Sequence, residues 1–177
     1  MRLFTGTYID RENFQYIYDD IKEDFQAASF GKWVEKENLH FTYHFIGDVP
    51  DDKVEELRAG LADITVEYSS SLELKGIGVF PNLRRPRILH IPILSNNLLQ
   101  KIYKDIGSVL DSLGFEIDKK KYKPHLTLQR IKDYDKEKFR NLLNKYKDYD
   151  FGEMNSFKVS LIQSKLTSRG PVYKVLQ

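Results

Sequence analysis

Two short segments, His40-Phe41-Thr42-Tyr43 and His125-Leu126-Thr127-Leu128, lie 85 positions apart and share one pattern. Each belongs to an apolar run typical of a strand, and each run follows a predicted amphipathic helix. The chain has only six threonines, so two of its four histidines would seldom have a threonine two positions ahead by chance. The matching places predict two diverged repeats, residues 1–93 and 94–177, packed closely as one bilobal domain over residues 1–177.

The same order of elements occurs in both halves. After a first strand, each half runs helix, strand, helix, strand, strand. Asp10 is placed to cap the first helix, and no linker rich in Gly, Ser or Pro separates the halves. The expected helices are residues 11–28, 51–61, 97–113 and 136–146, and the expected strands are residues 2–9, 39–46, 72–80 with a break at its glycines, 87–93, 122–131, 157–166 and 172–176.

The composition fits a folded domain with a core. Hydrophobic residues make up 41% of the 177 and charged residues 31%, which excludes a disordered or collagen-like chain. The 28 Lys+Arg and 26 Asp+Glu give a net charge of +2, which argues against a long non-specific nucleic-acid stripe. The chain has no cysteine, so disulfides, thiol nucleophiles and Cys-ligated metal centres are excluded.

The N-terminal residues 1–10 lack the apolar stretch and the small-residue cleavage site of a signal peptide. No run approaches the roughly 18 apolar residues that a membrane span needs. We therefore expect a cytoplasmic protein with no membrane contact.

The two segments carry groups suited to acid–base chemistry. In a strand, residues i and i+2 point to the same face about 6–7 Å apart, so each segment presents an imidazole beside a hydroxyl. If the lobes face each other across a cleft, both pairs converge. Because the ordinary pKa of histidine is near 6.5, one imidazole can act as base and the other as acid near neutral pH. Hydroxyls can donate to phosphate oxygens, so the set suits metal-free attack on a phosphodiester.

These segments resemble the twin His-x-Thr-x motifs of the 2H phosphoesterase superfamily. The similarity is greatest to its RNA 2',3'-cyclic phosphodiesterase branch, also called 2'-5' RNA ligase. The similarity extends along most of the chain. One His-x-Thr motif would be weak evidence for the family, whereas two motifs with matching flanks are specific evidence. The flanks that carry it are Asn38-Leu39, Phe45-Ile46-Gly47-Asp48-Val49, residues 78–87, Lys123-Pro124, Gln129-Arg130 and Gly170-Pro171-Val172-Tyr173.

The resemblance implies an α+β fold in which two antiparallel sheets line a central cleft and the helices lie outside. It implies metal-independent hydrolysis of RNA 2',3'-cyclic phosphate ends to a 2'-phosphate, with possible reversal as 2'-5' ligation, and no cofactor. By the family pattern His40 is the proton donor and His125 the proton acceptor. Thr42, Thr127 and Arg130 then hold the phosphate, and Phe45 is a candidate for stacking on the base.

For several other polar residues the sequence allows more than one role. In a regular strand Arg130 would face away from His125, so its contact with phosphate requires a bulge, a twist or the strand's end. His44 lies too far from His40 on a strand to share a metal ion, and either shapes the rim of the cleft or has no functional role. His90 lies in an apolar strand and is expected to be structural. Arg84, Arg85 and Arg87 either contact RNA or form a solvated loop.

Two alternatives remain open. The chain could be a phosphodiesterase for another 2'-5' or cyclic nucleotide, or a non-catalytic module that binds RNA ends or nucleotides. The expected partners are RNA or nucleotides with 2',3'-cyclic phosphate ends. No obligate protein partner is expected, and the protein is expected to be a monomer.

Overall fold

The computed structural model describes residues 1–9, 11–95, 97–118, 120–168 and 170–177. Within them the helices are α1 (Arg11–Gln26), α2 (Val54–Leu61), α3 (Leu98–Ser112) and α4 (Lys136–Lys145), with the short 3-10 turns η1 (Lys36–Asn38) and η2 (Asp51–Lys53). The strands are β1 (Arg2–Tyr8), β2 (Ser29–Trp33), β3 (His40–Asp48), β4 (Glu67–Tyr68), β5 (Leu72–Lys75), β6 (Gly78–Phe80), β7 (Ile88–Leu94), β8 (His125–Tyr134), β9 (Asp150–Met154), β10 (Phe157–Lys158), β11 (Ser160–Thr167) and β12 (Gly170–Val175).

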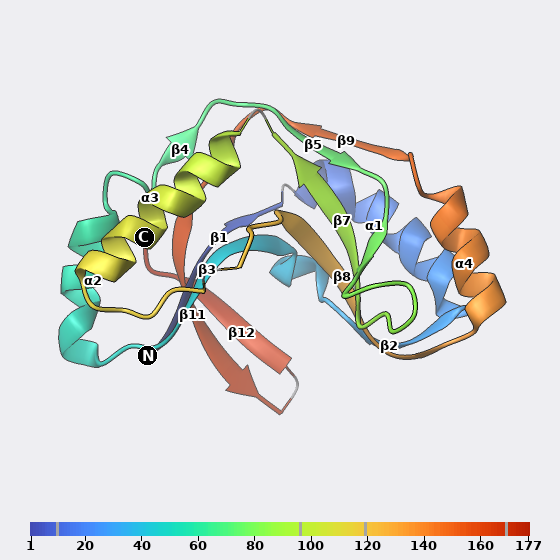
Figure 1. Ribbon diagram of the computed structural model, residues 1–177, viewed down its shortest axis with the longest axis horizontal. Helices are drawn as coiled ribbons and strands as arrows, with labels where there is room; N and C mark the ends of the chain where they lie inside the picture. Colours follow the sequence, from blue (N-terminus) through green and yellow to red (C-terminus); the bar gives the residue numbers. More distant parts are fainter. Residues whose placement is uncertain (10, 96, 119, 169) are drawn as a thin grey trace.

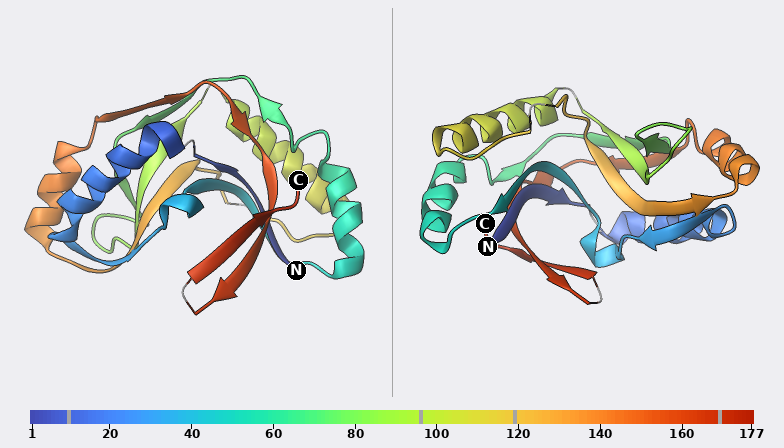
Figure 2. Two further views of the ribbon diagram at one scale, coloured as in Figure 1. Left: turned by 180° about the vertical axis from the view of Figure 1, so that it is seen from behind. Right: turned by 60° about the horizontal axis from the view of Figure 1, so that its bottom comes forward.

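Two antiparallel sheets form the body of the molecule, and β10 pairs with β4 in a separate two-stranded sheet. The smaller sheet has the order β12-β11-β1-β3, and the larger has the order β2-β8-β7-β5-β9 with β6 beside β7. Helices α2 and α3 lie at one end and α1 and α4 at the other, with the sheets between them (Figure 1). The hairpin β11–β12 projects from this body (Figure 2). The predicted α+β class, with antiparallel sheets and outer helices, is confirmed.

The lobes in space do not coincide with the halves of the sequence. The smaller sheet joins β1 and β3, from the first half, to β11 and β12, from the second. In the larger sheet β8 lies between β2 and β7, which both precede it by many residues. Each sheet therefore needs strands from both halves, and neither half could bury its sheet alone.

Several elements differ from the sequence prediction. The break predicted at the glycines of residues 72–80 is present and divides the segment into two strands, because Gly76 turns the chain with φ +74°. The two strands, β5 and β6, pair with different ends of β7. Residues 157–166 likewise divide into β10 and β11, and β2, β4 and β9 were not predicted. The predicted cap at Asp10 lies outside the described residues.

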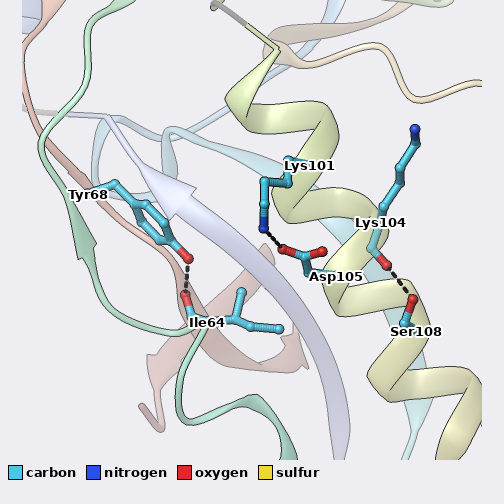
Figure 3. A network of polar contacts seen from close by, with 6 residues as sticks. All are labelled: Ile64, Tyr68, Lys101, Lys104, Asp105 and Ser108. Carbon is cyan, nitrogen blue, oxygen red and sulfur yellow. Dashed lines mark hydrogen bonds and ion pairs between the residues drawn. The ribbon is translucent and has the colours of Figure 1, made fainter.

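The helices form for reasons visible in the sequence. Asp135 caps the N-terminus of helix α4, and its side chain accepts hydrogen bonds from the backbone N–H groups of Glu137 and Lys138. On the exposed side of α3, Lys101 pairs with Asp105 one turn later (Figure 3). The opposite side of α3 is apolar and buried, through Leu99, Ile102, Ile106 and Leu110. None of the described helices is long and apolar enough to cross a membrane.

Strand β2 lies very close to β8 at Gly31. A Cβ atom at position 31 would lie 2.1 Å from the carbonyl oxygen of Arg130, closer than any real contact of this kind. The pairing also shifts register between Phe30 and Gly31. Only glycine therefore lets β2 support the part of β8 that carries Arg130.

Replacement Gly31→Ala is expected to destabilise the protein, because backbone atoms must move to admit the new methyl group. We expect a loss of about 3 kcal/mol of unfolding free energy, which lowers Tm by roughly 6–12 °C for a chain of this size. Phe30→Ala is the matched control, since that side chain is 72% exposed, and it should change stability by less than about 0.5 kcal/mol. A wild-type melting temperature for Gly31→Ala would contradict this description of the β2–β8 contact.

Candidate active site

The two motif histidines have the same local geometry. The Nδ1 atom of His40 lies 2.6 Å from the carbonyl oxygen of Asn38, and Nδ1 of His125 lies 2.7 Å from that of Lys123. In both cases the acceptor belongs to the residue two positions earlier. A carbonyl oxygen only accepts, so each Nδ1 must carry the proton and donate it. In the neutral ring the lone pair is then on Nε2, which is the atom available for proton transfer.

Both motif strands contain a β-bulge at the same place. Along β3 the exposure runs half-buried, buried, half-buried, buried, buried, exposed from His40 to Phe45. The same six-residue pattern begins at His125 in β8 and ends at Arg130. The pairing with the neighbouring strand skips Tyr43 in one case and Leu128 in the other.

This bulge decides which way the fifth residue after each histidine points. In a regular strand Phe45 and Arg130 would lie on the face opposite to their histidines. One extra residue restores them to the face that His40 and Thr42, or His125 and Thr127, already share. Of the three irregularities that would let Arg130 face the phosphate, a bulge, a twist or the strand's end, the structure has the bulge. Phe45 has the corresponding position in the other motif.

Arg130 lies close to groups of the smaller sheet. Its charge contributes to lowering the pKa of His40, and it opposes the rise in the pKa of Tyr173 that burial causes. Strand β3 contacts β8, which brings the two motifs together across the sheets. Lys32 is the cross-strand partner of Arg130 on β2. The structure therefore gathers His40, Arg130 and Tyr173 at one place.

The pKa values of both motif histidines are lowered, and in each case burial is the main cause. For His40 the positive charges of His125 and Arg130 lower the pKa further. No such charge acts strongly on His125. Both rings therefore favour the neutral form more strongly than an exposed histidine does.

The surroundings of the two histidines differ although their geometry is shared. His40 is packed among three aromatic rings, those of Phe4, Tyr8 and Tyr173, at centroid distances of 5.1, 6.0 and 5.1 Å. His125 is packed edge-to-face against Phe80 at 4.9 Å. Its other aromatic neighbour is a second imidazole. The two motifs therefore have the same local geometry, but different side chains pack against their histidines.

That second imidazole belongs to His90, which is the direct cross-strand partner of Thr127. The His90 ring stacks on Phe80 at 3.9 Å and lies 5.3 Å from that of His125. Burial lowers the pKa of His90 to about 3, so this ring stays neutral. It was expected to be purely structural, and it is buried, but it lies directly beside the motif.

His44 lies outside the site. Its ring is buried and stacks on Tyr103 at 4.0 Å, and its Nε2 atom donates to the Tyr103 carbonyl oxygen 2.9 Å away. The bulge turns His44 to the face opposite His40, toward α3. Of the two readings left open for His44, a residue of the cleft rim and a residue without functional role, its position favours the second.

Phe45 is unusual for a phenylalanine because its side chain is 74% exposed. Its ring touches Phe4 at 5.9 Å, and Phe4 in turn contacts His40. An exposed ring on the face of the motif leaves a surface on which a planar group could stack.

The sequence did not single out four residues that the structure places around the motifs. Phe80 and Tyr173 lie in segments that carry the family resemblance, yet nothing in the sequence indicated contact with His125 or His40. Nothing in the sequence marked Phe4 as a site residue, because an apolar residue in a strand is usually part of the core. Lys32 was not marked either, because its strand, β2, was not predicted. Among the described residues, no three His, Asp or Glu side chains group as metal ligands.

Both a family model and individual proteins of known name are similar to this chain over most of its length. The family model described as LigT like phosphoesterase matches residues 11–90 and, a second time, residues 91–173. An RNA 2',3'-cyclic phosphodiesterase of Methanocaldococcus jannaschii is 39% identical over 178 residues, covering 100% of this chain and 99% of that protein. One from Aquifex aeolicus is 34% identical over 180 residues, covering 100% and 95%.

Solved structures share the fold. The Thermus thermophilus protein TT0787 superposes with a TM-score of 0.80 at 25% identity, covering 100% of this chain and 96% of that one. Escherichia coli LigT, in a complex with 3'-AMP, has a TM-score of 0.77 at 20% identity, covering 99% and 95%.

The free protein should show both motif histidines as Nδ1–H tautomers with pKa values below 6.5. The reasons are the two carbonyl acceptors and the burial of both rings. Nitrogen-detected NMR of 15N-histidine-labelled protein across pH 4–8 measures tautomer and pKa together. Exposed histidine in a short peptide, with its ordinary pKa, is the reference. An Nε2–H tautomer at either residue, or a pKa above 6.5, would show that the hydrogen bonds do not hold in solution.

Proposed function

The chain belongs to the LigT-like phosphoesterase family, and we propose that it hydrolyses RNA 2',3'-cyclic phosphate ends to 2'-phosphates without a metal ion. The observation that carries this proposal is the pair of Nδ1-anchored imidazoles on touching strands, with Arg130 beside them. The names of the M. jannaschii and A. aeolicus relatives support the same substrate. With a 5'-hydroxyl in place of water as the nucleophile, His125 would take the hydroxyl proton, the P–O3' bond would break with O3' protonated by His40, and a 2'-5' linkage would form.

The proposed reaction uses one proton acceptor and one proton donor. Nε2 of His125 takes a proton from water as the water oxygen attacks phosphorus. The P–O3' bond breaks, and Nε2 of protonated His40 gives its proton to O3'. The product is a 2'-phosphomonoester and a free 3'-hydroxyl. The proton count closes because His125 has gained what His40 has lost, and exchange with solvent resets both.

Three further residues are proposed to hold the phosphate. The hydroxyls of Thr42 and Thr127 share a strand face with their histidines and can donate to the non-bridging oxygens. Arg130 adds a charge-assisted contact that strengthens as negative charge builds on those oxygens. Phe45 is proposed to stack on the terminal base. These roles follow the family pattern, and the bulge in each strand supports them.

The assignment of donor and acceptor needs the substrate. In the free protein, Arg130 and His125 disfavour the charged form of His40, which must nevertheless be protonated to act as the donor. A bound phosphate brings negative charge that opposes this effect and raises both pKa values. We therefore propose that the donor acquires its proton in the complex with substrate.

We also propose that the protein works as one domain of two repeats, as a monomer, in the cytoplasm. The second enzymatic candidate is a phosphodiesterase that acts on another cyclic or 2'-5' nucleotide. The size of the site that holds the base is the feature that would distinguish these substrates. A module that only binds RNA ends would retain the same geometry without turnover.

The test of the proposed activity is hydrolysis of a 2',3'-cyclic mononucleotide and a cyclic-phosphate-ended RNA in EDTA, with the product identified by phosphorus NMR. A 2'-phosphate product in EDTA is the expected result. Loss of activity in EDTA, or a 3'-phosphate product, would contradict the proposal. Tight binding without turnover would identify a binding module instead.

The roles of the histidines can be separated with a substrate whose 3'-oxygen is replaced by sulfur. A thiolate leaves without being protonated, so this substrate does not need the donor. His40→Ala and His125→Ala should each lose at least about 100-fold on the oxygen substrate. The sulfur substrate should restore most of the rate to His40→Ala and none to His125→Ala. Rescue of His125→Ala instead would reverse the assignment.

A further inference from the structure

The loop between β6 and β7, residues 81–87, is called the arginine loop here because it carries Arg84, Arg85 and Arg87. All three side chains are exposed. Within the described parts of the chain none of them forms an ion pair, although eight ion pairs form elsewhere in those parts. The reaction proposed above does not use them.

The backbone of the arginine loop is held in place by its own hydrogen bonds. The side-chain oxygen of Asn82 accepts from the N–H groups of Arg84 and Arg85, at 3.0 and 3.1 Å. Arg87 donates its N–H to the carbonyl of Phe80 and accepts from Ile131 through its own carbonyl. An ordered backbone presents the guanidinium groups with a smaller entropy loss on binding than a mobile loop would.

The arginine loop is continuous with the proposed active site. It begins directly after Phe80, whose ring contacts His125 and lies 5.8 Å from the ammonium group of Lys123. It ends directly before Ile88, the cross-strand partner of Arg130. A continuous set of positively charged side chains therefore extends from the site into the arginine loop. Among the described residues none of these side chains forms an ion pair with a carboxylate.

An open hollow of about 680 Å³ lies along the same loop. Gly78, Val79, Asn82, Leu83 and Arg84 line it. Leu83 is 69% exposed, so the hollow offers apolar surface beside a guanidinium group. Apolar surface next to arginines suits an unstacked base followed by its phosphate.

We propose that the arginine loop binds the RNA strand on the 5' side of the cyclic-phosphate end. This inference rests on the proposed function and names the surface that would distinguish RNA from a mononucleotide at the same site. A 2',3'-cyclic phosphate occurs at a 3' end, so the rest of the strand leaves the site in one direction. Guanidinium groups bind phosphates bidentately. The net charge of +2 supplies little general attraction, so a local cluster must provide it.

The test compares kcat/KM for cyclic-phosphate-ended RNAs from one to six nucleotides long. For the wild type, kcat/KM should rise with length. In Arg84→Glu, and separately in Arg85→Glu, the hexanucleotide-to-mononucleotide ratio should fall about fivefold at 0.1 M salt, from a slope of about 0.7 per phosphate contact. The salt dependence for the hexanucleotide should become less steep by the same 0.7. Arg84→Lys, which keeps the charge, should retain most of the ratio.

Lys104→Glu is the matched control, because it makes the same charge reversal on α3, where the exposed lysine side chain extends away from the helix (Figure 3). It should leave the ratio unchanged. Equal ratios in wild type and Arg84→Glu would overturn the inference. So would an equal fall in Lys104→Glu, or a fall confined to Lys174→Glu on the projecting hairpin. If the wild type hydrolyses neither the mononucleotide nor the RNA, the proposed function fails, and that outcome is distinct from these.

Discussion

The hydrogen bond from each Nδ1 to the carbonyl two residues earlier is the interaction on which the candidate site depends. It fixes the tautomer, so that Nε2 is left as the one atom that can accept or donate a proton. It also fixes the ring, because donor and acceptor belong to the same short stretch of backbone. The β-bulge three residues later adds the second constraint, since it brings Phe45 and Arg130 back to the face of their histidines. A regular strand would have pointed both away.

The two motifs share this geometry and differ in chemistry. On β3 the fifth residue is an exposed ring and the histidine is surrounded by aromatic rings. On β8 the fifth residue is a guanidinium group, and the histidine is packed against Phe80 and the neutral ring of His90. The fifth residue of one motif is therefore suited to stack on a base, and the fifth residue of the other is suited to bind a phosphate. In the absence of substrate the pKa of His40 is lowered first by burial and further by the charge of Arg130 from the other motif, which lies close to it.

Much of the fold and the two histidines could be predicted from the sequence, since long amphipathic helices and apolar strands have clear periods. The sequence also indicated that a contact between Arg130 and phosphate requires a bulge, a twist or the strand's end, and the structure contains the bulge. The sequence could not locate that bulge, because a bulge depends on the register with β7, a partner 40 or so residues earlier in the chain. Strand β2 was missed because it is short, contains Gly31 and is stabilised by β8 rather than by its own composition. The contacts of Phe4, Phe80 and Tyr173 arise only when strands from both halves interleave in the same sheets.

The most direct test of the central claim is a histidine NMR titration with and without a 2'-phosphate mononucleotide. If one phosphate lies between the two imidazoles, its negative charge should raise the pKa of His40 and the pKa of His125 together. The buried ring of His44, outside the site, serves as the internal reference and should not change. A rise at only one of the two motif histidines, or at neither, would show that the pair does not act on a single phosphate.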